Sequence, residues 1–313
     1  MKNILALGYE NISVVSSKEN LPQKYPGIIV FTSLEEAVLK TKFEYAVIAT
    51  PPVNHVKELD TLIEAGIQNI YVEKPLSNDL EGINALIKKL AHTEINIQVG
   101  FDMRYDPGLQ KVQSLIAEKI IGQIVSVNAQ VGQYLPDWRT GDYSKGISAK
   151  KELGGGVLLD LVHEFDYLYW LFGEVELLAC LNTNSGALKI ETEDVAELIF
   201  KFKNGTLGSL HLDYLQQKLI RNCLITGSEG TITWDLPSQI VSWLNGKKDE
   251  HHFSYTNFSR NDRFKKCMQD FLEKNDASCK VDFLQGIKSL QMVCAAKRSS
   301  ETKQFISPRG MLY

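Results

Sequence analysis

The sequence predicts an α/β fold, with a doubly wound parallel sheet in a first domain and an open, mainly antiparallel sheet in a second, α+β domain. Before residue 104, short β-branched runs alternate with helical segments, which is typical of parallel strands buried on both faces. After residue 104, closely spaced strands follow one another, with Asn204-Gly205 and Ser228-Glu229-Gly230 as hairpin turns. We therefore predict two domains, residues 1–103 and 104–313.

Each element of the first domain can be located from its residue pattern. Strands are expected at residues 12–15, 28–31, 45–49, 69–72 and 96–99. Helices are expected between them at residues 33–40, 54–65 and 78–91, and each starts at a residue type that caps helices. Because the carboxyl ends of parallel strands face the ligand crevice, residues just after these strands are the first candidates for a site.

The second domain is expected to place its helices on one face of its sheet. Helices are expected at residues 107–119, 155–172, 260–273 and 281–299. Strands are expected at residues 123–133, 193–202, 206–214, 221–226, 231–235 and 239–244. The chain contains no internal repeat, low-complexity segment or long linker, so we expect the two domains to be closely docked.

The bulk composition excludes several classes of protein. The 313 residues are 44% hydrophobic and 23% charged, which is the balance of a soluble globular protein. The net charge is −4, the pI is near 5.9, and neither sign forms a long block, so nucleic acid and anionic membranes are not expected partners. The expected partner is a small molecule.

Cysteine usage and hydropathy indicate a cytoplasmic protein. The five cysteines have no C-x-x-C spacing, so neither a zinc site nor a disulfide framework is predicted, and an odd number suits a reducing compartment. The most apolar stretch, residues 157–172, is interrupted by ionisable side chains and is shorter than the ~18 apolar residues that cross a bilayer. The N-terminal apolar run is too short for a secretory signal. His251-His252 has no partner at metal-ligand spacing, so no metal is predicted.

The most informative motif is Glu73-Lys74-Pro75, which closes a hydrophobic strand about ninety residues before His163. An ammonium at a strand end can hold a hydroxyl group, although a lone lysine there is more often solvated. His163 follows Gly154-Gly155-Gly156 in an apolar helix, where a lone histidine is more often packed than functional. Asp160 lies three residues before His163, so the carboxylate and the imidazole are expected on one helical face.

Taken together, these residues resemble the Gfo/Idh/MocA family of NAD(P)-dependent oxidoreductases, which act mainly on sugars and polyols. The segments that carry the resemblance are Ala49-Thr50-Pro51-Pro52-x-x-His55, Glu73-Lys74-Pro75, Val99-Gly100-Phe101-x-x-Arg104-Tyr105 and Gly154 to Asp166. The likeness runs over nearly the whole chain in the expected order. It implies a Rossmann-like first domain and a substrate-binding second domain. Residues 132–143 further resemble a subgroup associated with bacterial surface-sugar or nonulosonic-acid biosynthesis.

The resemblance implies a catalytic role for three residues. Lys74 would orient the substrate hydroxyl and stabilise developing negative charge. His163 would act as a general base toward that hydroxyl, for which an ordinary histidine pKa near ~6.5 is suited. Asp160 would support both groups, although many family members place the aspartate four residues before the histidine instead of three.

The resemblance also implies cofactor contacts at the exits of two strands. Thr50, Pro51, Pro52 and His55 would lie against the nicotinamide side of the cofactor, with a rigid strand exit as the alternative reading. Glu73 and Lys74, at the exit of the next strand along, complete this set.

Cofactor choice depends on the residues that follow the first strand. Ser16-Ser17-Lys18 lacks the acidic side chain that accepts from the ribose 2′-hydroxyl of NAD, and the adjacent lysine favours NADP. The triple glycine at residues 154–156 lacks the preceding strand and the later glycine of a dinucleotide loop, so we predict close backbone approach at a helix start there instead.

A group of aromatic and basic residues is the expected substrate-binding set. Tyr134, Trp138, Arg139 and Tyr143 lie between the first long strand of the second domain and the glycine-rich helix. Aromatic faces stack on the apolar faces of sugars, and arginine can bind a carboxylate or phosphate with two hydrogen bonds. The alternative is a surface loop that packs its own aromatics. Arg104 is a further candidate, with an interdomain salt bridge as its alternative role.

Members of the family begin with a strand and a G-x-G-x-x-G turn, and the start of this chain resembles the end of the helix that follows that turn. We therefore expect the chain to enter an incomplete Rossmann-like fold within that helix, without roughly 20 to 25 residues of the usual fingerprint unit. The neighbouring strands would then expose unpaired edges unless they pair again. Either the natural start lies upstream, or the protein has lost ordinary dinucleotide binding and takes no cofactor.

The sequence thus predicts an enzyme that transfers a hydride between NAD(P) and a hydroxyl carbon of a sugar or sugar derivative. The alternative is a non-catalytic sugar-binding or interaction protein that retains the crevice without the cofactor. The presence of the lysine, aspartate and histidine together favours the enzyme. The family resemblance also implies a homodimer or homotetramer, formed through the open sheet of the second domain.

Overall fold

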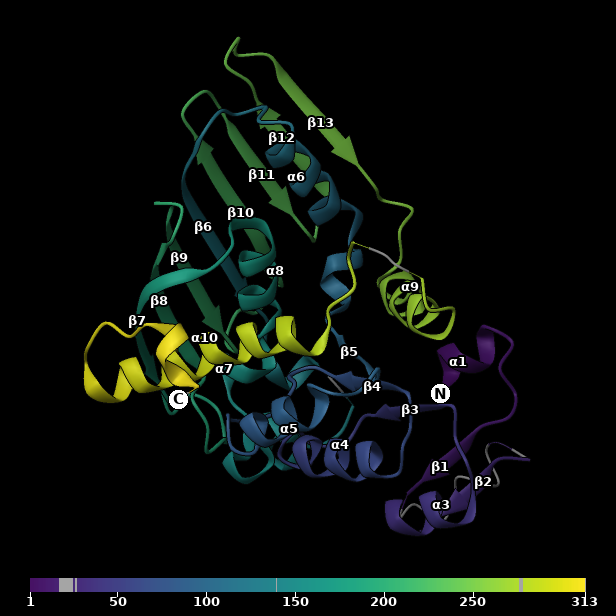
Figure 1. Ribbon diagram of the computed structural model, residues 1–313. Coiled ribbons are helices and arrows are strands. Elements are labelled where there is room, and N and C mark those ends of the chain that lie inside the picture. The colour runs from purple at the N-terminus through teal and green to yellow at the C-terminus, as the bar shows by residue number, and fades with distance from the viewer. Residues whose placement is uncertain (17–24, 26, 139, 276–277, 313) are drawn as a thin grey trace.

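The computed structural model describes residues 1–16, 25, 27–138, 140–275 and 278–312. Figure 1 shows a group of parallel strands with their helices, joined to a large twisted sheet. The N-terminus lies beside the first group, and the C-terminal helix crosses between the two. This arrangement confirms the predicted fold class.

The parallel strands form two small sheets. Their bounds lie within one residue of the predicted ranges: β1 (Ser13–Val15), β2 (Ile29–Phe31), β3 (Tyr45–Ile48), β4 (Asn69–Glu73) and β5 (Asn96–Gly100). β1 pairs with β2, and the second sheet has the order β3-β4-β5. The apolar residues of β4 are buried throughout, as expected for a parallel strand covered on both faces. In the part of the chain that the structure describes, β1 and β3 therefore each form a sheet edge.

Helices connect these strands and are capped by their own side chains or by turns. They are α3 (Leu34–Lys40), α4 (His55–Glu64) and α5 (Ile83–Leu90), and the short α1 (Lys2–Ala6) precedes β1. Ser33 caps α3 by accepting from the amide of Glu36 at 3.1 Å. The expected start of α5 at residue 78 is wrong. The Asp79 carboxylate accepts from the amide of Glu81 and Gly82 adopts φ 74°, so a turn delays the helix.

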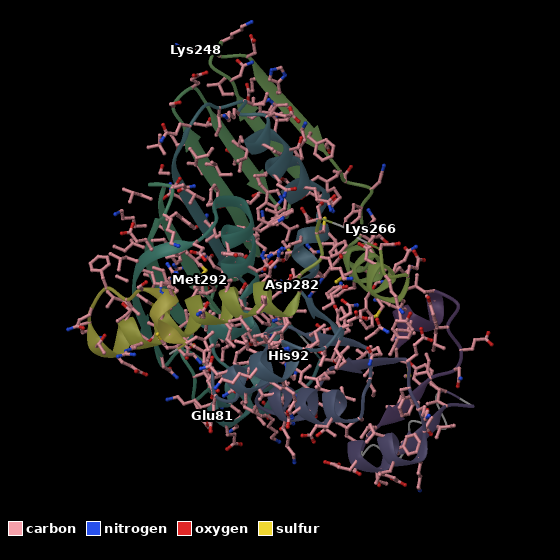
Figure 2. The ribbon with its side chains drawn as sticks, viewed as in Figure 1. Glu81, His92, Lys248, Lys266, Asp282 and Met292 are labelled. Carbon is pink, nitrogen blue, oxygen red and sulfur yellow. The ribbon has the colours of Figure 1, made fainter. Side chains whose placement is uncertain are left out.

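The second sheet has eight strands in the order β13-β12-β11-β10-β6-β9-β8-β7. The strands are β6 (Ile124–Gly132), β7 (Val175–Thr183), β8 (Val195–Phe202), β9 (Leu207–Asp213), β10 (Ile220–Gly227), β11 (Thr231–Asp235), β12 (Ile240–Leu244) and β13 (Glu250–Ser254). Every neighbouring pair is antiparallel except β6 and β9. The strand ranges predicted for residues 123–244 are confirmed, whereas β7 and β13 lie outside every predicted range. Figure 2 shows Lys248 at the tip of the β12–β13 hairpin.

Helices cover one face of this sheet (Figure 1). They are α6 (Pro107–Ala117), α7 (Val157–Asp160), α8 (His163–Phe172) and α10 (Phe283–Thr302), while α9 (Arg260–Leu272) lies apart. The helix predicted for residues 155–172 is divided, because Leu161 and Val162 separate α7 from α8. Asp160 therefore ends one helix and His163 begins the next.

The later part of the chain also contacts the first sheet. The amide of Val99 donates to the carbonyl oxygen of Val281 at 2.8 Å, so the segment before α10 borders β5. Asp282 marks this point in Figure 2. α9 packs against α1 and against the 3₁₀ helix η2 (Asp102–Tyr105), with Phe271 fully buried between them and β4. These contacts bring α9 next to the carboxyl ends of β4 and β5.

The remaining short elements are 3₁₀ turns that shape the loops. They are η1 (Pro52–Asn54), η3 (Leu135–Asp137), η4 (Tyr143–Lys145), η5 (Ile147–Ala149), η6 (Lys151–Leu153) and η7 (Pro308–Met311). None of the helices seen in the described ranges is long and apolar enough to cross a membrane.

Candidate active site

The candidate site forms where β4 and β5 end side by side. Glu73 pairs in register with Gly100, so the residues that follow each strand are neighbours. Lys74 follows β4, and Asp102 follows β5 after Phe101. The α7–α8 segment reaches this same edge, because Lys74 binds the backbone of Asp160 at the end of α7.

Lys74 connects the first sheet to the end of α7. Its Nζ donates to the carbonyl oxygen of Asp160 at 2.7 Å. The side chain remains partly exposed, and the Lys74–Pro75 peptide bond is cis. The predicted lysine therefore lies next to the predicted aspartate, but it binds the backbone of that residue and not its carboxylate.

The carboxylate of Asp160 is held by a residue that the sequence did not indicate. Its Oδ2 accepts from the hydroxyl of Tyr214 at 2.7 Å, and Tyr214 is fully buried just after β9. The ring of Trp138 meets the Tyr214 ring edge to face at 5.2 Å. The expectation that the Asp160 carboxylate converges with His163 on one helical face is wrong in this detail, because the break between α7 and α8 turns the carboxylate toward the sheet.

His163 faces a different carboxylate. Its Nε2 lies 3.4 Å from Oδ1 of Asp102, and both side chains are buried, with 8% of His163 and 3% of Asp102 exposed. The ring also packs edge to face on Phe101. Burial, followed by the positive charges of Lys74 and of arginines on β10 and α9, holds the pKa of His163 well below its usual value. The neutral imidazole, which can accept a proton, is therefore the favoured form.

Asp102 belongs to the site although the sequence reading passed over it. Arg263 of α9 lies behind it, with Nε 3.1 Å from Oδ2 of Asp102. Burial raises the pKa of Asp102, and Arg263 opposes that rise most strongly. The signal that could have found Asp102 is its position. It is an ionisable residue just beyond the carboxyl end of β5, and β5 pairs with the strand that Lys74 follows.

Glu73 carries the other perturbed carboxyl group of the site. Burial raises the pKa of Glu73 to about 7, with Asp102 adding to the rise and Lys74 opposing it. A carboxyl group that changes charge near neutral pH, next to the candidate lysine, makes the electrostatic potential of the site sensitive to pH.

Arg104 does not face a ligand. It is 1% exposed and binds Asp166 of α8 through two hydrogen bonds, Nε to Oδ2 at 2.9 Å and Nη2 to Oδ1 at 2.7 Å. Its Nη1 donates to Gln285 of α10 at 3.0 Å. The structure therefore gives Arg104 a buried ion pair and no open face for a ligand, contrary to the substrate-binding prediction. The alternative, an interdomain salt bridge, is met only as a salt bridge, because Arg104 and Asp166 both lie in the second predicted domain, residues 104–313.

His55 contacts the segments that follow β3 and β4. Its ring is fully buried, with Nδ1 2.9 Å from the carbonyl oxygen of Pro75 and Nε2 3.0 Å from that of Thr50. The Thr50 hydroxyl donates to Glu58 at 2.7 Å, and Pro52 is buried at the start of η1. These contacts fit the rigid strand exit, because no part of the His55 ring is open to a cofactor.

The triple glycine allows close approach between loops. A Cβ atom at Gly154 would come within 2.9 Å of Asn78 and 3.3 Å of Pro52, and Gly154 adopts φ 78°. Glu193 occupies the start of α7, where the amide of Val157 donates to its backbone oxygen at 3.1 Å. An acidic residue at this position disfavours phosphate, so the loop serves packing against the strand exits.

The expected substrate-binding aromatics lie near Asp160 but also pack locally. Trp138 donates from Nε1 to the carbonyl oxygen of Gln133 at 3.1 Å, and the Tyr143 hydroxyl accepts from the amide of Lys189 at 3.2 Å. Tyr134 is half-buried against the core. Of these residues, Trp138 is tied to the site directly, because it contacts the tyrosine that holds Asp160.

Four residues of the sequence predictions fall outside or at the margin of the described residues. Arg139, Ser17 and Lys18 lie outside them. Ser16 is described, and its amide donates to the carbonyl oxygen of Phe31 at 3.1 Å. The NADP preference inferred from this segment therefore stays a prediction.

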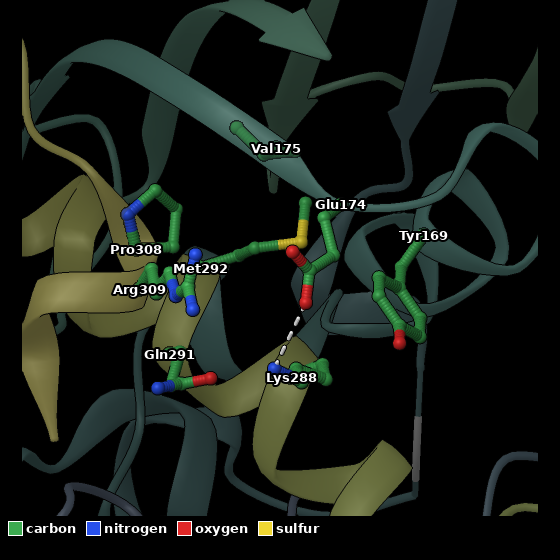
Figure 3. A pocket seen from close by; sticks show the side chains of 8 residues that line it. All are labelled: Tyr169, Glu174, Val175, Lys288, Gln291, Met292, Pro308 and Arg309. Atoms are coloured by element: carbon green, nitrogen blue, oxygen red, sulfur yellow. Dashed lines mark hydrogen bonds and ion pairs between the residues drawn. The ribbon is translucent and has the colours of Figure 1, made fainter. Parts of the chain in front are cut away.

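Two hollows elsewhere in the molecule are less suitable as ligand sites. The one in Figure 3 lies where α8, β7 and α10 meet, beside the ion pair of Lys288 and Glu174 at 3.2 Å. It encloses about 20 Å³, which admits roughly one water molecule. The other, of about 280 Å³, is lined by Phe43 and Ile67 at the amino ends of β3 and β4. Ligands of parallel α/β sheets bind at the opposite ends.

The residues present fit the nicotinamide end of a dinucleotide. The strand exits and the partly exposed Lys74 offer charged and polar groups at one edge of the sheet. Within the described ranges, no glycine-rich turn follows β1 to receive a pyrophosphate. Nor do those ranges place three or more histidine, cysteine, aspartate or glutamate side chains where they could hold a metal ion.

Family comparisons match both halves of the chain. Residues 9–101 match the oxidoreductase family model with an NAD-binding Rossmann fold, and residues 109–233 match the C-terminal domain of the GFO/IDH/MocA group. Oxidoreductase P35 of Formosa agariphila is 27% identical over 273 residues, which are 82% of this chain and 80% of that protein.

Two further similar proteins carry a sugar derivative, one in its name and one as the molecule bound in its solved structure. The 2,7-anhydro-N-acetylneuraminate hydratase of Escherichia coli is 24% identical over 227 residues, which are 71% of this chain and 60% of that protein. The WlbA dehydrogenase of Bordetella pertussis, solved with NADH and UDP-GlcNAcA, has a TM-score of 0.80 at 20% identity. That match covers 97% of this chain and 93% of the other, and at this identity it shows the shared fold.

Proposed function

Since the chain belongs to the Gfo/Idh/MocA family of NAD-binding oxidoreductases, we propose that it transfers a hydride between a nicotinamide dinucleotide and a hydroxyl carbon of a sugar or sugar derivative. The observation that carries the proposal is the contact between the two parts of the chain at Lys74. The lysine donates to Asp160, three residues before His163, at the carboxyl edge of the parallel sheet.

The residues support a division of roles in the oxidative direction. The ammonium of Lys74 orients the hydroxyl oxygen and stabilises the negative charge that develops on it. His163 takes the hydroxyl proton as the C–H bond breaks and the C=O bond forms. The bound dinucleotide would supply the acceptor for the hydride, which leaves the carbon with its electron pair. Asp160 keeps Lys74 in place through its carbonyl oxygen, and Tyr214 fixes the position of Asp160.

A sugar substrate is favoured by the aromatic residues and by the relatives. Trp138 packs on Tyr214, which binds the Asp160 carboxylate, and aromatic faces bind the apolar faces of sugar rings. One similar protein is named for a neuraminate derivative and another is solved with UDP-GlcNAcA bound, which supports a place in bacterial surface polysaccharide or nonulosonic-acid metabolism. The serine- and lysine-containing segment after β1 favours NADP over NAD.

Direct titration of the chain with NADPH and NADH, followed by fluorescence, tests cofactor binding before any substrate is known. We expect saturable binding, tighter for NADPH. Absence of detectable affinity for both at millimolar concentration would rule out catalysis by this chain. It would favour the alternative, a non-catalytic sugar-binding or interaction protein.

The roles of Lys74 and His163 are tested by substitution once a turnover assay exists. Lys74→Met and His163→Ala are each expected to lower kcat by about 10²- to 10⁴-fold, the range typical of a positioned acid or base. Lys57→Met serves as the matched control, because Lys57 is an exposed lysine on α4. Unchanged turnover in either site variant would refute the assigned role.

We also propose that the protein forms a homodimer or homotetramer through the open face of the eight-stranded sheet. Along β8, exposed and buried residues alternate, and the exposed Ile199 faces away from the covering helices. Leu181 and Leu207 are exposed on the neighbouring strands β7 and β9, and Leu224 is exposed on β10 of the same sheet. Apolar residues gathered on an uncovered sheet face favour association. All five cysteines are free and buried, which supports the expected cytoplasmic location.

A further inference from the structure

We propose that His211 is a positioning residue, whose imidazolium fixes the turn after β9 and thereby holds Tyr214 against Asp160. The inference rests on the proposed function, in which Asp160 keeps Lys74 in place. It concerns a histidine that lies outside all the sequence motifs described above, on the face of the eight-stranded sheet opposite the covering helices.

His211 lies between two carboxyl groups on the uncovered face of the sheet. Its neighbours along β9 are buried leucines, so the imidazole points to the opposite face. Its Nδ1 lies 2.6 Å from Oε1 of Glu197 on β8, and its Nε2 lies 2.8 Å from Oδ2 of Asp213 on β9. Gln130, the in-register neighbour on β6, is neutral. Within the described strands β6, β8 and β9, the two carboxyl groups are therefore the charged neighbours of the imidazole.

The two contacts determine the charge of His211. An ionised carboxylate only accepts hydrogen bonds, so each ring nitrogen must donate, and a neutral imidazole carries a single N–H. The imidazolium is the form that satisfies both contacts. The hydrogen bond to Asp213 raises the pKa of His211 to about 9, with burial opposing the rise and Glu197 adding to it. His211 is thus charged at neutral pH.

Asp213 connects the imidazolium to the turn after β9. Its Oδ2 faces His211, while its Oδ1 accepts from the amides of Leu215 and Gln216 at 2.6 and 2.7 Å. Burial favours the protonated acid, but hydrogen bonds from His211 and from the two amides hold the pKa of Asp213 below its ordinary value. One carboxylate oxygen therefore binds the sheet and the other binds the turn.

The turn begins at the residue that holds the candidate site. Tyr214 follows Asp213 in the chain, and its hydroxyl donates to Asp160 at 2.7 Å on the covered face of the sheet. The amide of Tyr214 donates to the carbonyl oxygen of Asp194 at 2.9 Å, so backbone pairing holds the chain up to this residue. Beyond it, the amides that Asp213 binds fix the direction of the chain.

Gly132 of β6 leaves room for this arrangement. It pairs in register with Asp213, and a Cβ atom there would come within 2.3 Å of Oδ2 of Asp213 and 2.1 Å of Cγ of Gln216. A side chain at Gly132 would therefore displace both the carboxylate and the turn. Gly132→Ala thus disturbs the contact between His211 and the turn without removing a charge.

Nitrogen NMR of the full chain labelled with ¹⁵N-histidine tests the charge of His211 without turnover. The His211 signals are those missing from the spectrum of His211→Gln. At pH 8, where a histidine with an ordinary pKa near ~6.5 is neutral, we expect both nitrogens of His211 to be protonated. Asp213→Asn should remove this state. A wild-type spectrum with no doubly protonated histidine at pH 8 would overturn the proposal, and that result needs no variant.

Amide hydrogen exchange at pH 7.5 tests whether the imidazolium fixes the turn. His211→Gln and Gly132→Ala should each raise the exchange rates of the two amides that donate to Asp213 by at least ~10-fold. The control is His252→Gln, which removes a histidine that hydrogen-bonds Ser242 at 2.9 Å between β12 and β13. It should leave both rates unchanged. Wild-type rates in His211→Gln would overturn the proposal.

A double-substitution cycle tests whether His211 acts through Tyr214, once a turnover assay exists. His211→Gln and Tyr214→Phe should each lower kcat by about 10- to 100-fold, as displacement of a reacting group by ~1 Å does. The combined variant should lose no more than Tyr214→Phe alone, because both changes remove the same constraint. Additive losses, or a wild-type kcat in either single variant, would refute the positioning role.

These tests separate the inference from the proposed function. If the chain turns over no substrate, the proposed function fails, while the NMR and exchange results still decide whether the imidazolium fixes the turn. If kcat depends on Lys74 and His163 but not on His211, the proposed function stands and the positioning role fails.

Discussion

Replacing Arg104 by methionine is predicted to lower the free energy of unfolding by about 3–5 kcal/mol at pH 7.5, the usual cost of removing one partner of a buried ion pair. The pair is well suited to this test. Arg104 and Asp166 are 1% and 0% exposed, and two hydrogen bonds of 2.9 and 2.7 Å join them. Without the guanidinium, the Asp166 carboxylate keeps only the hydroxyl of Ser289, 3.3 Å away, as a polar side-chain contact in the described residues.

The predicted loss depends on pH, with a definite sign. Burial raises the pKa of Asp166, and Arg104 is the first group that opposes this rise. In Arg104→Met the folded-state pKa of Asp166 therefore moves further up. A carboxyl group with a raised folded-state pKa keeps its stability below the unfolded value near ~3.9 and loses it as pH rises through the folded value. The variant should thus be close to wild type below pH 4 and show its full loss at neutral pH.

Urea unfolding followed by far-UV circular dichroism measures this effect. Two controls accompany the variant. Arg104→Met combined with Asp166→Leu removes both charges and should recover most of the lost stability. Lys201→Met breaks an exposed ion pair with Glu176 and should cost less than about 1 kcal/mol.

One result would refute the reasoning. If Arg104→Met unfolded within about 1 kcal/mol of wild type at pH 7.5 while the KM for substrate rose, Arg104 would be a substrate ligand. The salt bridge would then contribute little to the fold.

Three further predictions concern the site and the assembly. Glu73→Gln should stabilise the protein by about 1–3 kcal/mol at pH 8 and not below pH 5, because the Glu73 pKa rises from 4.5 to about 7 on folding. Urea unfolding at both pH values measures this gain. An equal gain at the two pH values would contradict the prediction. His55→Ala should lower the free energy of unfolding by about 2 kcal/mol, because it removes the ring that joins the carbonyl groups of Thr50 and Pro75. A variant of unchanged stability with weakened cofactor binding would indicate a ligand contact instead. Ile199→Asp should convert the oligomer to monomer in sedimentation velocity runs, whereas a monomeric wild type would contradict the proposed sheet interface.

Most strands could be located from the sequence because their β-branched runs are local signals. The five parallel strands begin and end within one residue of the predicted positions. β7 was missed because Leu177, Leu178 and Ala179 favour helix as readily as strand when read alone. Its conformation is decided by pairing with β8 and by the bridge from Leu178 to Ile306, both remote in sequence.

Only part of the candidate site could be predicted from the sequence. Lys74, Asp160 and His163 were predicted from strand-end position, from spacing and from the family resemblance, and their catalytic roles stay predictions. Their partners were not found, because Tyr214 lies 54 residues from Asp160 and Asp102 lies far from His163 in sequence. A hydrogen bond between such residues has no local pattern.

The sequence by itself determined the order of strands and helices, the fold class, and the strand exit at which Lys74 stands. These follow from hydrophobic period and from turn residues, which act over a few positions of the chain. The tertiary structure alone decided which carboxylate faces which cation. It paired Arg104 with Asp166 and placed Asp102 against His163, because burial makes an unpaired charge costly and the partner is whichever group the packing brings within reach.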